Sequence, residues 1–290
     1  MRAYVALCKP RIVELLLITA VPTLFLAYRG LPSLLVTVVV VIGGALAAGS
    51  ANALNCYIDR DIDEVMHRTS GRPLVRHTVA PRSALVFGAL LGVVAVALFA
   101  AATNLLAAGL TLAAIVYYVV IYTMLLKRHT SQSTLWGGVC GAAPVLIAWA
   151  AATGSLSWAA ALLFAVVFFW QPPHFWALAI KYREDYRRAG IPMLPVVAGL
   201  QETRRQILIY SLVLAPLGAL PWLMGFAGPL YGAVSIIAGV GMVALGIRVK
   251  REDGLTAAKQ LFAFSILYLF LLFAVLLADD RLGHLLGRAT

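Results

Sequence analysis

The sequence predicts an all-α polytopic membrane protein with nine transmembrane helices. Of its 290 residues, 62% are hydrophobic and only 12% are charged, and the mean hydropathy is +0.92. Soluble globular domains do not have such a composition. A run of about twenty apolar residues is long enough to cross a bilayer as a helix. Nine such runs are found, at 12–28, 34–56, 83–102, 104–126, 134–152, 157–180, 207–225, 229–248 and 260–278.

The distribution of basic residues predicts that the N-terminus is cytoplasmic. With that orientation only Arg29, Arg281 and Arg288 of the 23 Lys and Arg residues fall outside. Cytoplasmic loops of membrane proteins carry such an excess of bases. The net charge of +11 therefore reflects topology, and we expect the lipid bilayer and no nucleic acid as a partner. The expected location is a bacterial plasma membrane or an equivalent inner membrane.

Two long charged segments, at about 57–82 and 181–206, follow the second and sixth spans and so lie on the same, cytoplasmic side. Long charged loops commonly carry function. Residues 1–290 are expected to form a single integral-membrane domain, because no linker or low-complexity tract divides them.

Small residues and cysteines are interpreted as packing groups. Pairs of small residues four apart let helices approach closely, as at Gly44 and Ala48, and at Gly137 and Gly141. The cysteines show neither metal-ligand spacing nor a disulfide pattern. They are Cys8, Cys56 and Cys140.

The acidic stretch that follows the second span predicts a site for a divalent cation. Asn55, Asp59 and Asp63 are four residues apart, so on a continuous helix they share one face, whereas Asp61 points elsewhere. Carboxylate and amide oxygens suit Mg2+, which is usually held by a few carboxylates together with substrate phosphates. The alternative is a solvated helix end whose acids pair with neighbouring arginines.

Bases that flank the acidic face are candidates for binding an anionic substrate. Arg68 and Arg72 follow it, and guanidinium groups bind phosphate oxygens in pairs. Lys127 and Arg128 cap the next cytoplasmic loop. Each base could also serve topology alone.

The second charged segment begins inside the sixth span. Pro172 and Pro173 are predicted to break or kink that helix, and a cavity or a neighbouring helix must then satisfy the freed carbonyl groups. Beyond the prolines, His174, Lys181 and Asp185 share a face, with His174 about 10 Å deeper than Lys181. A histidine within the bilayer is a candidate for substrate binding. An interhelical hydrogen bond is the open alternative.

Together these residues resemble the UbiA-type intramembrane prenyltransferases. The motif of that superfamily, an Asn followed by two Asp at four-residue steps, is matched by Asn55, Asp59 and Asp63. The resemblance to the heme-modifying branch of the superfamily rests on three segments, NCYIDRDIDEVMHRTSGRPL, YTMLLKRHT and QPPHFWALAIKYREDYRRAGIPMLPVV.

The resemblance implies nine helices around a central cavity open to lipid, and a prenyl diphosphate bound through Mg2+. Farnesyl diphosphate is the implied donor and heme b the implied acceptor, with water quenching the cation that forms on heme. A downstream heme-modifying or oxidase-assembly protein is an implied partner.

By the same resemblance, the metal ligands are Asp59, Asp63 and Asp185, and the catalytic residues are these three with Lys181. His174 is the residue expected to contact heme. The second superfamily motif usually has two acids four apart, but Lys181 stands at the first of these positions, where it can bind diphosphate and not metal.

Two alternatives remain open on the sequence. A related prenyltransferase could act on an aromatic acid or a chlorophyll precursor. A secondary transporter would also have interrupted helices and intramembrane polar groups. However, transporters place ionisable residues near the midplane, whereas the acids here lie almost entirely at the cytoplasmic edge.

Overall fold

The protein is an integral membrane protein built from helices. The computed structural model describes the backbone of residues 1–285 and the side chains through Asp279, so Arg288 lies outside the described residues. Within the described part, nine helical segments are long and apolar enough to cross a membrane. They are α2 (Pro10–Tyr28), α3 (Leu34–Ile58), α5 (Pro81–Ala102), the continuous run of α6 (Leu105–Val116), η2 (Tyr117–Leu126) and α7 (Lys127–His129), α8 (Ser133–Thr153), α9 (Trp158–Lys181), α12 (Gly199–Leu223), α13 (Pro229–Arg251) and α14 (Thr256–Leu285).

Each predicted apolar run coincides with one of these nine segments, and the main difference is at the seventh. There α12 begins at Gly199 instead of residue 207, because hydropathy marks apolar residues and not helical ones. The first turns of α12 are polar but are held in place by tertiary contacts. Arg204 is buried, and its guanidinium lies 2.7 Å from a carboxylate oxygen of Asp253.

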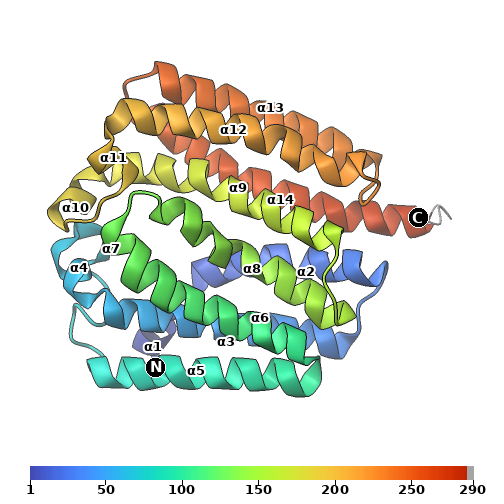
Figure 1. Ribbon diagram of the computed structural model, residues 1–290, viewed down its shortest axis with the longest axis horizontal. Coiled ribbons are helices and arrows are strands. Elements are labelled where there is room, and N and C mark those ends of the chain that lie inside the picture. The colour runs from blue at the N-terminus through green and yellow to red at the C-terminus, as the bar shows by residue number, and fades with distance from the viewer. Residues whose placement is uncertain (286–290) are drawn as a thin grey trace.

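The short helices gather at one end of the molecule, which we call the site end (Figure 1, left). They are α4 (Arg60–Val65), η1 (His67–Thr69), α10 (Arg183–Arg188) and α11 (Leu194–Val197). They form the two charged segments of the sequence, and an apolar cluster joins them. In this cluster Ile62 and Met66 pack with Tyr186 and Met193.

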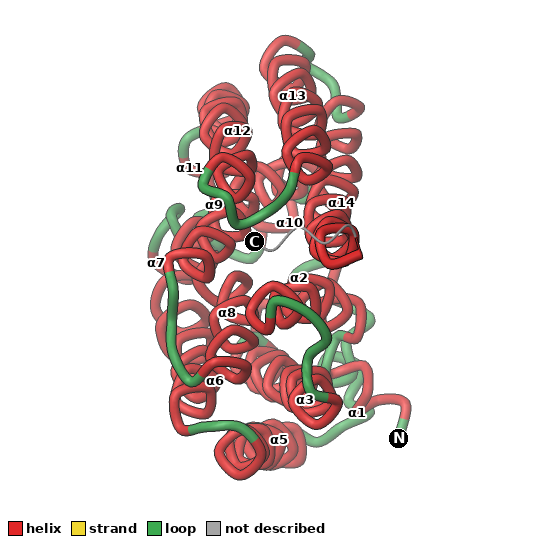
Figure 2. The backbone as a smooth tube through the Cα atoms, turned by 90° about the vertical axis from the view of Figure 1, so that its right-hand side faces the viewer, coloured by secondary structure: helices red, strands yellow, loops and turns green. Residues whose placement is uncertain are grey.

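The spanning helices are arranged with α12 and α13 at one edge of the bundle and α5 at the other (Figures 1 and 2). The largest buried cluster packs α8, α9, α12, α13 and α14 together. A second cluster packs the far ends of α2, α3, α5, α6 and α8. The helices between the two edges surround the cavity described below.

The two prolines of α9 do not break the helix, which corrects the first of the two predicted outcomes, a break or a kink. α9 runs without interruption from Trp158 to Lys181. Pro172 and Pro173 each remove one backbone donor, but both are buried, as is most of the helix around them. Packing on several sides keeps the chain helical. The cavity that the prolines predicted does lie beside them.

Candidate active site

Asp59 and Asp63 are buried carboxylates at the junction of α3 and α4. The backbone N–H of Asp59 donates to the carbonyl of Asn55 (2.9 Å), and that of Asp63 donates to the carbonyl of Asp59 (2.8 Å). The four-residue spacing therefore continues across the junction and turns all three side chains to one side. Asp59 and Asp63 are 0% and 2% exposed, whereas Asp61 is exposed. The prediction of one shared face is confirmed.

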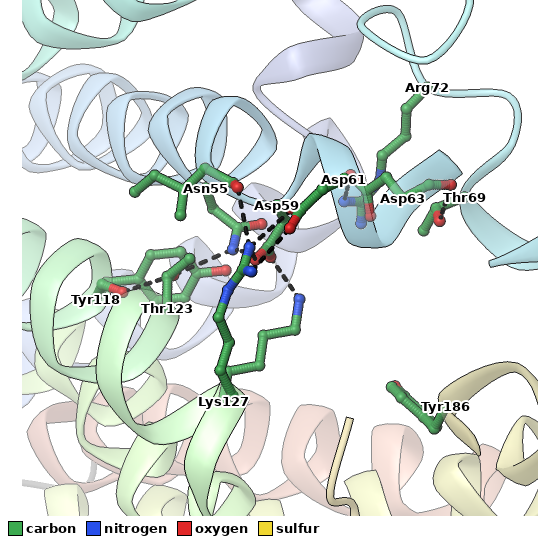
Figure 3. A network of polar contacts seen from close by, with 12 residues as sticks. Asn55, Asp59, Asp61, Asp63, Thr69, Arg72, Tyr118, Thr123, Lys127 and Tyr186 are labelled. Carbon is green, nitrogen blue, oxygen red and sulfur yellow. Dashed lines mark hydrogen bonds and ion pairs between the residues drawn. The ribbon is translucent and has the colours of Figure 1, made fainter. Parts of the chain in front are cut away.

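Each of the two buried carboxylates has a basic partner (Figure 3). Lys127 Nζ donates to Oδ2 of Asp59, and Arg72 Nη1 donates to Oδ2 of Asp63. The partners come from different segments, η2 with α7 and the loop after η1. Removing one member of a buried ion pair typically costs about 3–5 kcal/mol, because the other charge remains without its partner.

Arg128 lies between the exposed Asp61 and the buried Asp59, with its Nη2 3.7 Å from Oδ1 of Asp59. Its guanidinium donates two hydrogen bonds of 2.8 Å to the exposed Asp61. These bonds lower the pKa of Asp61 to about 2. Arg128 also donates to the carbonyl of Ile58 (3.1 Å), so it secures the end of α3 from outside.

Asn55 connects Asp59 to Thr123 and Lys9, two residues that the sequence analysis does not select. Its Nδ2 donates to Oδ2 of Asp59 (2.7 Å) and to Oγ1 of Thr123 (3.1 Å). Its Oδ1 accepts from Nζ of Lys9 (2.8 Å). Desolvation lowers the pKa of Lys9 to about 8. Lys9 was interpreted from the sequence as a topological base only, and no local pattern distinguishes it from its neighbours.

Thr123 and Lys127 are placed by an unusual backbone. η2 is a π-helix of ten residues, and Oγ1 of Thr123 donates to the carbonyl of Tyr118 five positions earlier (2.8 Å). π-Helical turns are rare in proteins, and those that occur are often found at functional sites. The wider helix turns Tyr118, Tyr122 and Lys127 together toward the interior, where all three line the cavity.

The cavity has a volume of about 300 Å³ and changes character along its length. At the site end it is lined by Lys9, Arg68, Arg72 and Lys127. Its deeper walls are apolar and are lined by residues of α2, α3, α5, α6 and α8, including Ala20, Val40, Gly44, Ala48, Phe99, Gly137, Gly141 and Ile147. The small residues that predicted close helix packing therefore also make room for the cavity.

Along α3, the cavity extends from Asn55 to Val40, fifteen residues or about 22 Å. Such a shape fits a ligand with an anionic head and a long apolar chain.

The second charged segment contributes less to the cavity than the sequence predicts. Asp185 Oδ2 accepts from the backbone N–H of Arg68 (3.0 Å), and Asp185 does not line the cavity. Lys181 is exposed, with its ammonium 4.9 Å from the centre of the Tyr182 ring. Tyr186, which no sequence pattern singles out, does line the cavity, and its hydroxyl accepts from Arg68 Nη2 (3.4 Å).

The three acids that the resemblance implies as metal ligands do not lie together in the described structure. Within residues 1–279, no three side chains of His, Cys, Asp or Glu lie together as a metal-binding group. Asp185 is not brought to Asp59 and Asp63, because the chain turns at Tyr182 (φ −104°, ψ 21°) before α10 begins. Asp185 as a third metal ligand stays a prediction.

Two carboxylates nevertheless fit a hard cation that also binds a diphosphate. Oδ1 of Asp59 is buried and accepts no hydrogen bond in the described structure, and the closest basic group is Nη2 of Arg128 at 3.7 Å. A buried carboxylate oxygen without a donor is costly unless a ligand satisfies it. Asp59 and Asp63 therefore fit Mg2+ with substrate oxygens and water as its other ligands.

Gln171 is a buried polar residue of the cavity wall. Its Nε2 donates to the carbonyl of Gly138 on α8 (2.7 Å) and is 3.4 Å from that of Val167. A Cβ atom at Gly141 would lie 2.5 Å from Oε1 of Gln171, so glycine at 141 makes room for this amide.

His174 lies in the packing between α9 and α14 and does not line the cavity. Its ring stacks between Trp170 and Phe262, with ring centres 4.4 and 4.5 Å away. Its Nδ1 lies 2.7 Å from Oγ of Ser265, which itself donates to the carbonyl of Phe262. Since the Ser265 proton is used there, Nδ1 is the donor. This geometry favours the interhelical hydrogen bond over a heme contact.

We expect His174→Ala to lower the free energy of unfolding by roughly 1–3 kcal/mol through the lost hydrogen bond and ring packing. Heme affinity, followed by the Soret band of the purified protein, should stay nearly unchanged. A lost Soret band without a change in unfolding midpoint would contradict this and restore the heme contact.

Comparison with known proteins places these features in one family. The model of the UbiA prenyltransferase family matches residues 16–277. A protoheme IX farnesyltransferase of Salinispora tropica is 55% identical over 281 residues, which cover 96% of this chain and 88% of the relative. Protoheme IX farnesyltransferase 1 of Saccharopolyspora erythraea is 51% identical over 291 residues, which cover 97% of this chain and 90% of the relative.

Solved structures share the fold. A digeranylgeranylglyceryl phosphate synthase structure aligns with a TM-score of 0.80 at 15% identity and covers 96% of this chain and 98% of that one. A UbiA homolog from Archaeoglobus fulgidus bound to GPP and Mg2+ aligns with a TM-score of 0.66 at 21% identity, covering 94% and 100%. At these identities the likeness shows the fold alone.

Proposed function

This chain belongs to the UbiA prenyltransferase family, and from that premise we propose that it transfers the farnesyl group of farnesyl diphosphate to a vinyl group of protoheme IX (heme b), giving heme O and diphosphate. The observation that carries the proposal is the identity of about half of all residues, over nearly the whole chain, to relatives named protoheme IX farnesyltransferase. The cavity supports the proposal. Basic side chains line its opening at the site end, which we call the mouth, and apolar side chains line its deeper part.

The donor binds with its diphosphate at the site end and its chain in the apolar part of the cavity. Within residues 1–279, the guanidinium of Arg68 has no ion pair with a carboxylate. Arg68 lines the cavity at its mouth, and its guanidinium binds diphosphate oxygens there. Lys127 and Arg72 each hold a carboxylate and also line the cavity, so they add positive charge at the same place.

Asp59 and Asp63 would hold Mg2+, which when bound would supply a Lewis acid for the negative charge of the departing diphosphate. The bases at the mouth stabilise the same charge as the bond between the first farnesyl carbon and oxygen breaks. Meanwhile the apolar walls exclude water from the allylic cation. The heme vinyl group then forms the new carbon–carbon bond. One water molecule adds to the resulting cation on the porphyrin side and gives up a proton to the released diphosphate or to solvent, which leaves a hydroxyl group.

In this proposal the site end faces the cytoplasm of a bacterial plasma membrane. The uneven distribution of Lys and Arg supports the orientation, since twenty of 23 fall in segments assigned to that side. An aromatic acid is the competing acceptor.

The test is product analysis with purified protein, farnesyl diphosphate, Mg2+ and heme b. The expected product, weighed by mass spectrometry, is heme that has gained one farnesyl group and one hydroxyl group. Chelation of Mg2+ should abolish its formation. Parallel reactions with 4-hydroxybenzoate should give no product. Farnesylation of the aromatic acid with unmodified heme would contradict the acceptor, while leaving the family unaffected.

A further inference from the structure

Lys9 is the only residue of the cavity mouth that comes from the N-terminal turn, between α1 (Arg2–Leu7) and α2. Its backbone is left-handed, with φ 52° and ψ 66°. Left-handed backbone is unfavourable for a residue with a side chain, and the following residue, Pro10, disfavours helical conformations before it. Unfavourable backbone is often found where a side chain has a functional position to keep.

The turn is held in this conformation by contacts with α3. Leu7 is fully buried in a cluster with Ala53 and Cys56. The carbonyl of Cys8 accepts from Nδ2 of Asn52 (3.1 Å). The next residue, Lys9, then places its ammonium against Oδ1 of Asn55. Three consecutive residues are thus fixed to one face of α3, and the last of them reaches the metal site.

The ammonium of Lys9 decides which way the Asn55 amide faces. Lysine can only donate hydrogen bonds, so the atom facing it must be the amide oxygen. The Nδ2 group must then face Asp59 and Thr123, where it finds two acceptors. In the opposite orientation, an amide N–H group would face an ammonium, and two oxygens with no proton between them would face each other at Asp59.

The fixed amide in turn decides which oxygen of Asp59 remains available. Oδ2 accepts from both Asn55 and Lys127. Oδ1 is buried and has no hydrogen-bond donor in the described structure. Within residues 1–279, Lys9 has no carboxylate partner that would account for its burial by direct ion pairing.

We propose that Lys9 is a positioning residue of the metal site: it holds Asn55 as a hydrogen-bond donor to Oδ2 of Asp59, and so leaves Oδ1 as the oxygen that binds the cation. Asn55 then orients a ligand and contributes no oxygen of its own to the metal. The inference rests on the metal dependence in the proposed function, and not on the identity of the acceptor.

The test measures Mn2+ affinity by electron paramagnetic resonance on the detergent-purified full chain, with saturating farnesyl thiodiphosphate as a non-reacting donor. Lys9→Met should weaken Mn2+ binding by about tenfold or more, the usual effect of losing a residue that orients a metal ligand. Lys9→Arg keeps the donor and should largely restore affinity. Arg11→Met removes a neighbouring exposed base and should leave affinity unchanged.

A double-mutant cycle separates positioning from direct contact with the diphosphate. If Lys9 acts through Asn55, then Lys9→Met combined with Asn55→Leu should bind Mn2+ no more weakly than Asn55→Leu alone. Losses that add, or wild-type affinity in Lys9→Met, would overturn the proposal. Folding of each variant is checked by its elution profile and thermal unfolding, and Lys9→Ala replaces Lys9→Met if the latter does not fold.

This measurement does not involve heme. If the chain farnesylates an aromatic acid and the Lys9 effects are as expected, only the proposed acceptor fails. If heme is farnesylated and Lys9→Met binds Mn2+ normally, only the positioning role fails.

Discussion

Asp59→Asn is expected to lower kcat for farnesyl transfer by at least about a hundredfold, the usual size of effect when a group that stabilises transition-state charge is removed. The change replaces the one carboxylate oxygen at this site that is buried and free of hydrogen bonds, Oδ1, by a neutral amide atom. Asp63→Asn should have a similar effect, because Asp63 is also buried and lies one turn further along the same face. The measurement is single-turnover formation of farnesylated heme.

Asp61→Asn is the matched control, since it removes a carboxylate from the same helix on its exposed side. Asp61 pairs with Arg128 near water, and exposed ion pairs contribute little to stability. Activity should change little, because Asp61 is exposed and does not share the face of Asp59 and Asp63. Equal losses at 59, 61 and 63 would falsify a site on one face.

Burial of the carboxylates adds a second expected effect. In the structure Asp59 is fully buried with Lys127, so Asp59→Asn should also lower the free energy of unfolding. Activity must therefore be compared at a temperature well below the unfolding midpoint of each variant.

The sequence predicts the spanning helices and the acidic face well because both depend on local periodicity. Apolar runs of membrane length are unambiguous. The phase of Asn55, Asp59 and Asp63 depends only on the geometry of one helix, which continues across the junction at Asp59. The same reasoning fails at Asp185, because a new helix axis begins after Tyr182.

Other parts of the site depend on contacts between distant segments and have no local signal. Lys9 meets Asn55 from 46 residues away, through a left-handed turn that no residue pattern announces. The π-helix that turns Thr123 and Lys127 inward occupies an ordinary apolar stretch, YYVVIYTMLL. The sequence selects His174 as a polar residue within a span, but only its contacts with Phe262 and Ser265 show that it faces α14.

Small residues on α3 could be interpreted correctly only in part. Gly44 and Ala48 do allow close packing, yet both also line the cavity. Spacing alone does not distinguish a residue that is small because a helix is near from one that is small because a ligand needs the space. The distinction leads to a prediction about the length of the donor.

Ala48→Leu is expected to change the preferred donor from farnesyl to geranyl diphosphate. Ala48 lines the cavity seven residues before Asn55, about 10 Å deeper along α3. A leucine there fills the path of the third isoprene unit but leaves room for two. Forcing a side chain and a ligand into the same space costs roughly 1–3 kcal/mol, so kcat/KM for farnesyl diphosphate should fall by about tenfold or more while that for geranyl diphosphate changes little. The measurement is competition between the two donors with heme b as acceptor.

Ala113→Leu is the matched control. Ala113 is exposed on α6, next to the cavity-lining Ala114, so this substitution adds the same volume to the outer surface instead of the cavity. It should leave the donor preference as in the wild type. The chemical groups at the mouth are unchanged in both variants, so a selective loss with the longer donor reports on the depth of the cavity and not on catalysis. Equal losses with both donors in Ala48→Leu would mean that α3 itself had moved, and the prenyl chain would then have to follow a different wall of the cavity.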